Sequence, residues 1–123
     1  MNVIIDNYDS FTFNLVQYIG ENDPSVVVYK NDEVSVQDLI NMNPSKIIIS
    51  PGPGHPEDSG VSIEMVREFY DKIPILGVCL GHQIIGLVFN SGITTASDIY
   101  HGKASKIYHS TSELFNGIDS PFD

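Results

Sequence analysis

The sequence predicts an α/β fold in which helices cover both faces of a parallel β-sheet, giving three layers. Short β-branched runs alternate with amphipathic runs along the chain, and this order favours right-handed crossovers between parallel strands. Residues 46–50 (KIIIS) have an uninterrupted apolar centre, which is typical of a strand covered on both faces. The length of 123 residues fits one domain with a single core, spanning residues 1–123.

The first predicted strand, residues 3–5, leads into a helix. Asp9 or Ser10 supplies the N-cap, and the helix runs to about residue 19, where Gly20 ends it. The helical period places one set of side chains on a common face: Phe11, Leu15, Tyr18 and Ile19.

The middle of the chain predicts two further strand and helix pairs. A strand at residues 26–29 precedes a short helix, which Ser35 opens as a capping box with Asp38 in the place of the usual glutamate. After the strand at 46–50 comes the loop PGPGHPEDSG, and then an amphipathic helix at residues 61–72. The helix places these side chains inward: Ile63, Val66, Tyr70 and Ile73.

The fourth predicted strand, residues 75–78, ends at the only cysteine of the chain. Residues 80–89 form a helix that is apolar on nearly every side, so we expect it to be buried. Short strands are plausible at residues 100–101 and 106–108, before a tail rich in turn-forming residues.

The charge of the chain excludes some classes of partner. Asp and Glu number 16 and Lys and Arg 6, so the formal net charge is −10. Such a surface repels nucleic acid and anionic membranes, so we expect neither as a partner. No apolar run approaches the roughly 20 residues that cross a bilayer, and the N-terminus shows no signal or transit pattern. One cysteine allows no internal disulfide. We expect a cytoplasmic protein, or one of the plastid stroma if its gene is plastid-encoded.

Cys79 is the strongest candidate for a catalytic residue. A lone cysteine is usually a buried structural thiol. Here, however, Gly77 and Gly81 flank it in the G-x-nucleophile-x-G pattern of a nucleophile elbow, a sharp strand-to-helix turn at which nearby side chains would collide. The turn places the sulfur at a helix N-terminus, where the dipole favours the thiolate. The amide of Leu80 points the same way and can bind an oxyanion.

The PGPG loop, residues 51–54, leaves the strand that we expect beside the nucleophile strand. Gly/Pro clusters are often only tight turns, and no Gly-Lys-Ser/Thr follows to make a phosphate loop. Elbow geometry, however, takes its second oxyanion donor from a neighbouring loop. Pro51 and Pro53 have no N–H, so only the amides of Gly52 and Gly54 can serve, and we favour Gly52.

These stretches together resemble the class I (triad-type) glutamine amidotransferases. Residues 77–83 (GVCLGHQ) are similar to the nucleophile motif of that family. Residues 50–54 (SPGPG), 6–12 (DNYDSFT) and 101–105 (HGKAS) narrow the resemblance to the glutaminase subunits (component II) of anthranilate synthase and aminodeoxychorismate synthase. The resemblance runs from the first residue to the last. It implies a flavodoxin-like fold and a type-1 glutamine amidotransferase domain, of which residues 1–123 would be the N-terminal part.

The resemblance also implies a reaction. The Cys79 thiolate attacks the side-chain amide of L-glutamine, ammonia leaves, and water hydrolyses the γ-glutamyl thioester to glutamate. Leu80 and Gly52 would bind the oxyanion, Gln83 would contact the glutamine, and Gly52, Pro53 and Gly54 would line its pocket. The ammonia would pass to a magnesium-dependent, chorismate-binding subunit (component I) for tryptophan or folate biosynthesis. No cofactor and no metal site is expected in this subunit.

The sequence does not supply the base that the family pairs with its cysteine. Relatives take a His and a Glu from a downstream His-Pro-Glu, whereas His55-Pro56-Glu57 directly follows the PGPG loop and is not expected to form the triad. We expect His82 to pack or hydrogen-bond on the flank of the first turn of its helix rather than to act as the base, His101 to make strand or loop contacts, and His109 to be solvated. We therefore expect a C-terminally truncated fragment that exposes a sheet edge, is poorly stable and has little or no glutaminase activity alone.

Two other interpretations stay open. The elbow also occurs in cysteine variants of α/β-hydrolases, which cleave esters or lactones, although Gln83 and the PGPG loop argue against this. Alternatively, the chain retains only the ability to bind the partner subunit. Asp9, Ser10 and Phe11 could belong to such a binding surface or could simply cap a helix.

Overall fold

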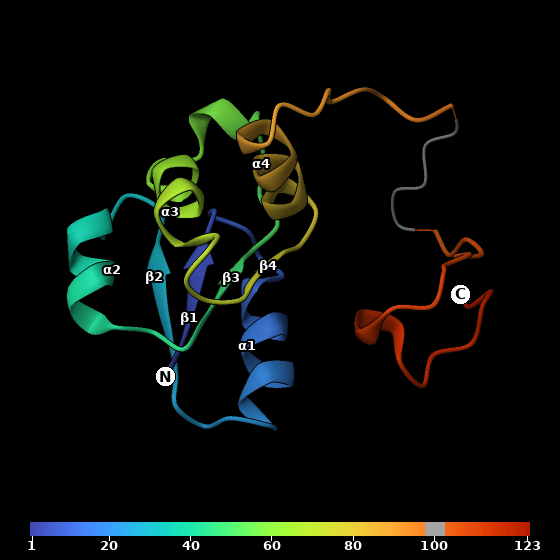
Figure 1. The fold of residues 1–123 in the computed structure, drawn as a ribbon, viewed down its shortest axis with the longest axis horizontal. Coiled ribbons are helices and arrows are strands. Elements are labelled where there is room, and N and C mark those ends of the chain that lie inside the picture. The colour runs from blue at the N-terminus through green and yellow to red at the C-terminus, as the bar shows by residue number, and fades with distance from the viewer. Residues whose placement is uncertain (98–102) are drawn as a thin grey trace. The chain divides into compact units, whose positions relative to one another are not determined.

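The computed structural model describes residues 1–97 and 103–123. The chain forms two compact units, Met1–Ile93 and Thr94–Asp123. The first unit contains a four-stranded parallel sheet of order β2-β1-β3-β4 (Figure 1). The strands are β1 (Asn2–Asp6), β2 (Val26–Lys30), β3 (Lys46–Ile49) and β4 (Ile75–Gly77). The prediction of an α/β fold with a parallel sheet is confirmed, whereas that of one domain over residues 1–123 stays a prediction.

Four α-helices surround this sheet. They are α1 (Thr12–Gly20), α2 (Val36–Met42), α3 (Ser62–Phe69) and α4 (Leu80–Val88), and a short 3-10 helix η1 (Pro56–Asp58) precedes α3. The chain steps from β1 outward to β2 and then back across the sheet to β3 and β4. Because crossovers are right-handed, the change of direction puts α1 on one face and α2 and α3 on the other. α4 packs beside α3 (Figure 1). The three predicted layers are therefore α1, the sheet, and the group of α2, α3 and α4.

The main core lies between the sheet and the layer of α2, α3 and α4. Its fully or nearly fully buried members come from inward positions of β1 and β3 and from the facing helices, as expected for burial of apolar surface. They are Val3, Ile5, Leu39, Ile47, Ile49, Met65, Val66, Phe69, Leu80 and Ile84. Ile4 and Ile48, at the alternate positions of β1 and β3, are also buried. β3 is therefore covered on both faces, as its sequence predicts.

The two predicted helix caps have different outcomes. Ser35 caps α2 with both bonds of a capping box: the Asp38 amide donates to Ser35 Oγ at 3.1 Å, and the Ser35 amide donates to Asp38 Oδ2 at 2.9 Å. The cap predicted for α1 is wrong, because its N-cap is Phe11 and has no side-chain cap bond. Asp9 instead accepts the Phe11 amide in the preceding turn, at 3.1 Å.

The predicted inner faces of the helices are partly wrong. On α1, Phe11 and Tyr18 are 62% and 68% exposed, because the buried residue is Thr12, which donates to Asp6 Oδ1 at 2.8 Å and fixes the rotation of the helix. On α3, Phe69 is buried, and the next residue, Tyr70, turns outward and lies edge-on to Phe89 with ring centroids 5.3 Å apart.

Burial of α4 is also less complete than its apolar sequence predicts. Only Leu80, Gly81 and Ile84 are buried, because one side of the helix faces the sheet and α3. No helix within the described ranges is long and apolar enough to cross a membrane.

The second unit, Thr94–Asp123, has little regular structure among its described residues, 94–97 and 103–123. It contains a 3-10 helix, η2 (Glu113–Phe115), and an isolated antiparallel bridge between Ile107 and Phe122. The strand predicted at residues 106–108 is therefore wrong, because Ile107 alone pairs, and does so in a single bridge. The strand predicted at residues 100–101 lies outside the described residues.

Candidate active site

A sharp turn joins β4 to α4 at the carboxyl edge of the sheet (Figure 1). Cys79 lies in this turn, as the N-cap residue of α4. Its backbone has φ 54° and ψ −107°, and its side chain is exposed. A non-glycine residue in this region costs about 1–3 kcal/mol and persists only where the surroundings impose it. Such strain gathers at functional sites, and here it turns the thiol out toward solvent.

Gly77 and Gly81 make this turn possible. A Cβ on Gly77 would lie 2.4 Å from the backbone carbon and oxygen of Gly81 and 2.6 Å from the His82 nitrogen. A Cβ on Gly81 would lie 2.4 Å from the Ile49 backbone oxygen. These are the collisions that the elbow pattern predicts. The first turn of α4 therefore packs directly on the backbones of both β3 and β4.

The start of α4 presents backbone donors beside Cys79. The Cys79 carbonyl accepts the Gln83 amide at 3.0 Å, and the Val78 carbonyl accepts the Gly81 amide at 3.0 Å. Among the described residues, the Leu80 amide has no hydrogen-bond acceptor. It is a helix N-terminal N–H, where the dipole favours a negative charge. Gln83 is half-buried on the same first turn.

The PGPG loop lies against the elbow at Gly52. A Cβ on Gly52 would lie 3.1 Å from Leu80 Cδ2 and 2.5 Å from the Asn7 Cβ and carbonyl oxygen. The predicted site residues Gly52 and Leu80 thus lie close together in the fold, although they are 28 positions apart in the sequence (80 minus 52). Pro53 and Gly54 are exposed, and Gly54 has a left-handed φ of 84°. The roles predicted for Cys79, Leu80, Gly52, Pro53, Gly54 and Gln83 stay predictions.

A buried polar cluster supports this loop, and the sequence reasoning missed it. The Asn7 backbone amide donates to Ser50 Oγ at 2.9 Å, and Asn7 Nδ2 donates to the Ser50 carbonyl at 3.0 Å. Asn31 Nδ2 donates to Asn7 Oδ1 at 2.9 Å. The available signal was the short polar segment that follows the first β-branched strand, within residues 6–12, which the sequence analysis used for the family resemblance without giving Asn7 a structural role.

Tyr8, next to this cluster, also has a left-handed backbone, with φ 62°. Its hydroxyl donates to Asp32 Oδ1 at 2.5 Å, and this bond, with the nearby negative charge, raises the pKa of Tyr8 to about 12. The Lys30 ammonium lies 5.3 Å from the centre of the ring. Tyr8 is therefore a neutral donor over the range of neutral pH.

No histidine of the described chain is hydrogen-bonded to the thiol. Within residues 1–97 and 103–123, no hydrogen bond reaches Cys79 Sγ. His82 is exposed, and so is His55 at the start of η1. His101 lies outside the described residues. Across the described ranges, no group of three or more His, Cys, Asp or Glu side chains could hold a metal ion.

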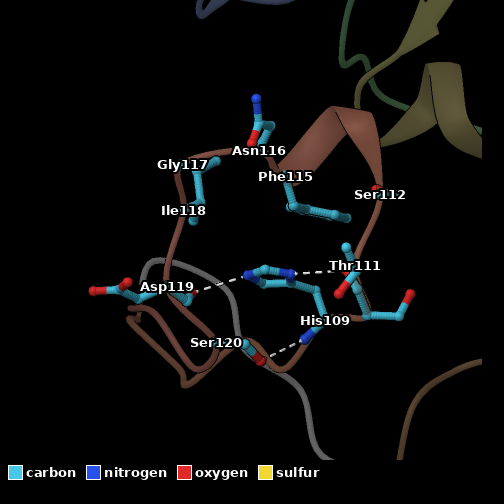
Figure 2. Close-up of a pocket in the computed structure, with 10 residues that line it drawn as sticks. His109, Thr111, Ser112, Phe115, Asn116, Gly117, Ile118, Asp119 and Ser120 are labelled. Carbon is cyan, nitrogen blue, oxygen red and sulfur yellow. Dashed lines mark hydrogen bonds between the residues drawn. The ribbon is translucent and has the colours of Figure 1, made fainter.

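His109 lies in the second unit and is not simply solvated as predicted (Figure 2). Its ring is half-buried and stacks on Phe115, with centroids 4.4 Å apart. Nε2 lies 2.9 Å from the Asp119 carbonyl oxygen, and Nδ1 lies 3.1 Å from that of Ser110. The imidazole thus holds together the turn that follows it, which explains its burial.

Comparison with known proteins gives a consistent result. The family model "Glutamine amidotransferase class-I" matches residues 3–123. "Anthranilate synthase component 2" of Pyropia yezoensis is 54% identical over 122 residues, covering 99% of this chain and 65% of the relative. "Aminodeoxychorismate synthase component 2" of Klebsiella aerogenes is 48% identical over 121 residues, covering 98% of this chain and 65% of the relative.

A solved structure shares the fold. The crystal structure of a protein described as "putative gmp synthase subunit a" from Thermoplasma acidophilum superposes with a TM-score of 0.72 at 23% identity, covering 98% of this chain and 61% of that protein. In each of these comparisons the chain spans less than two thirds of the length of the protein it matches.

Proposed function

The chain belongs to the class I glutamine amidotransferase family, and from this membership we propose that it acts as the glutaminase subunit of an anthranilate synthase. The observation that carries the proposal is the placement of Cys79. Its thiol is exposed in a strained turn at the N-terminus of α4, and the Gly52 loop packs against Leu80 beside it. This arrangement suits attack on a carbonyl whose oxygen becomes negative.

The proposed reaction has two halves. The Cys79 thiolate forms a C–S bond to the side-chain amide carbon of L-glutamine, and the carbonyl electrons move onto oxygen. The Leu80 and Gly52 amides stabilise that oxyanion, and such a donor is worth about 10²–10³ in rate. The C–N bond then breaks and ammonia leaves after it gains a proton. Water adds to the γ-glutamyl thioester, and glutamate and the free thiol are released.

Substrate recognition is assigned to the surroundings of the elbow. We place the glutamine side chain between Cys79 and the loop of Gly52, Pro53 and Gly54, with Gln83 contacting it from the first turn of α4. The support is that Gly52 contacts Leu80 and that Gln83 lies one helical turn from Cys79. The reaction also needs a base, and we assign that role to none of the described side chains.

The ammonia is proposed to reach a chorismate-binding partner subunit, component I, for the synthesis of anthranilate in tryptophan biosynthesis. The name of the Pyropia relative, component 2 of an anthranilate synthase, supports such a partner. The Klebsiella relative favours a second candidate, the glutaminase of an aminodeoxychorismate synthase in folate biosynthesis. We propose that this subunit works without a cofactor, in the cytoplasm or plastid stroma, and binds no nucleic acid or membrane.

Covalent labelling tests the proposal without requiring turnover. The probe is a chloroketone analogue of L-glutamine, whose ketone stands where the substrate amide carbonyl would lie. We expect one adduct, located on Cys79 by mass spectrometry, at a rate that L-glutamine slows and D-glutamine leaves unchanged. The Cys79→Ala variant should take up no label. Labelling that L-glutamine does not slow would contradict the proposal.

Two further measurements separate the alternatives. Acylation of Cys79 by an ester such as p-nitrophenyl acetate, faster than by the glutamine analogue, would favour the hydrolase interpretation. Capture of the chain by a chorismate-binding subunit without any glutamine-protected labelling would favour a module that only binds its partner.

A further inference from the structure

The polar cluster around Asn7 connects three loops at the carboxyl edge of the sheet. Asn7 follows β1, Ser50 follows β3 and Asn31 follows β2. Asn7 is only 3% exposed and Ser50 is fully buried. Buried polar groups are costly unless they are hydrogen-bonded, and here the Asn7 amide, both polar atoms of its side chain and the Ser50 hydroxyl have partners.

The bonds of Asn7 converge on the residue that begins the PGPG loop. Asn7 binds Ser50 twice, through its backbone amide to the hydroxyl and through Nδ2 to the carbonyl. The Ser50 hydroxyl in turn donates to the Pro51 carbonyl at 2.7 Å. That carbonyl belongs to the peptide unit whose nitrogen is the Gly52 amide. The orientation of this peptide plane is therefore linked to Asn7 through one hydroxyl.

Gly52 also packs directly on Asn7. The position of a Gly52 Cβ is already filled, because it would lie 2.5 Å from the Asn7 Cβ and carbonyl oxygen. Asn7 thus holds the loop both by hydrogen bonds to Ser50 and by contact with Gly52. The same Cβ position on Gly52 would also lie 3.1 Å from Leu80 Cδ2.

We propose that Asn7 is a positioning residue that aims the Gly52 amide at the oxyanion formed on the Cys79 substrate. The inference rests on the proposed glutaminase function and adds to it a residue that touches no substrate. A peptide plane can rotate without moving its neighbouring Cα atoms far, so a donor can be lost while the fold is retained. The clamp from Asn7 through Ser50 to the Pro51 carbonyl opposes that rotation.

The variants remove the clamp in parts. Asn7→Ala deletes Nδ2 and Oδ1 but keeps the Cβ and carbonyl oxygen on which Gly52 packs. Ser50→Ala deletes the hydroxyl that links the Asn7 amide to the Pro51 carbonyl. The matched control is Asn22→Ala, because exposed Asn22 also donates from Nδ2 to a backbone carbonyl, that of Tyr18 at 3.3 Å, but far along the chain from the elbow.

Two electrophiles separate positioning from general stability. With the L-glutamine chloroketone, the thiolate reacts through an adduct with a negative oxygen, and a C–S bond replaces the C–Cl bond as chloride leaves. With iodoacetamide, the thiolate displaces iodide directly and no oxyanion forms. Both reagents need the same thiolate. The maximal chloroketone rate, measured at saturating analogue and divided by the iodoacetamide rate, therefore reports on oxyanion binding rather than on thiolate reactivity or affinity for the analogue.

We expect Ser50→Ala, which breaks the link to the Pro51 carbonyl, to lower the chloroketone rate by about 10–100-fold, less than the loss expected for deletion of a donor, with iodoacetamide changed by less than about 2-fold. Asn7→Ala should lower the ratio by a smaller factor, because its backbone amide still donates to the Ser50 hydroxyl, and Asn22→Ala should leave the ratio at the wild-type value. Circular dichroism establishes that each variant is folded, and Ser50→Ala decides the question if Asn7→Ala does not fold.

Two results would overturn the proposal about Asn7 and leave the glutaminase assignment intact. One is a ratio of chloroketone to iodoacetamide rates in the folded variants that equals the wild-type ratio. The other is an equal fall in both labelling rates. If wild-type chain shows no glutamine-protected preference for the chloroketone, the proposed function fails, and the inference fails with it.

Discussion

Replacing Gly77 with alanine should push the first turn of α4 away from β4. The added Cβ would meet the backbone carbon and oxygen of Gly81 at 2.4 Å, about 1 Å inside the 3.4 Å at which ordinary contact begins. It would also meet the His82 nitrogen at 2.6 Å. All these atoms belong to backbone that the helix holds in place, so no side chain can rotate to make room.

The cost follows from that geometry. Overpacking that forces the backbone to move costs about 1–3 kcal/mol and sometimes more, and we expect the upper part of this range because backbone meets backbone. With a urea m-value of about 1.5 kcal/mol per M, a loss of about 3 kcal/mol moves the unfolding midpoint down by about 2 M. The displaced turn should also slow labelling of Cys79 by the L-glutamine chloroketone.

Gly20→Ala provides the matched control for this measurement. A Cβ on Gly20, the last residue of α1, would meet nothing within 4 Å, and its φ is not left-handed. That variant should gain roughly 0.5 kcal/mol, because alanine loses less conformational freedom than glycine on folding. Urea unfolding followed by circular dichroism compares the two. A Gly77→Ala midpoint within about 0.3 M of wild type, a shift of less than about 0.5 kcal/mol, would refute the steric reasoning.

Two further predictions concern the strained turn and the α2 cap. Cys79→Gly should raise the free energy of unfolding by about 1 kcal/mol, because glycine accepts the left-handed backbone of this turn. Cys79→Ala keeps the strain, so its free energy of unfolding should stay near that of wild type. Equal urea midpoints for the two variants would count against backbone strain at Cys79. At Asp38, hydrogen bonds from the backbone amide and then the side chain of Ser35 hold the pKa of the carboxyl below its ordinary value. The stabilisation is therefore present above the ordinary pKa of about 4 and is lost as the pH falls through the lower folded-state pKa. In thermal melts, the advantage of wild type over Asp38→Asn should be smaller at pH 2.5 than at pH 6. An advantage of the same size at both pH values would contradict this.

Local patterns predicted most of the fold and the elbow. The four strands were found from short β-branched runs, and the α2 cap from the spacing of Ser35 and Asp38, because each depends on neighbours in sequence. The collision between Gly77 and Gly81 could likewise be anticipated, since a strand-to-helix turn of this kind brings residues only four apart into contact, whereas the contact of Gly81 with Ile49 depends on the packing of α4 on β3.

The parts that sequence reasoning missed depend on side-chain hydrogen bonds that the apolar pattern does not reveal. Asn7 bonds to Ser50, 43 positions away, and no local pattern marks that pair. The rotation of α1 depends on the bond between Thr12 and Asp6, a polar contact that outweighs the apolar periodicity of Phe11 and Tyr18. Tertiary hydrogen bonds of this kind become visible only when strand ends are placed side by side.

The close packing of Gly77 and Gly81 also limits the motion of the sulfur. Backbone from α4 contacts backbone from β3 and β4, so Cys79 Cα cannot shift without moving the sheet. The thiol retains little more than rotation about its own Cα–Cβ bond. The entropy of holding a nucleophile in place is therefore lost when the chain folds, before substrate arrives, and little of it remains to oppose the approach to the transition state.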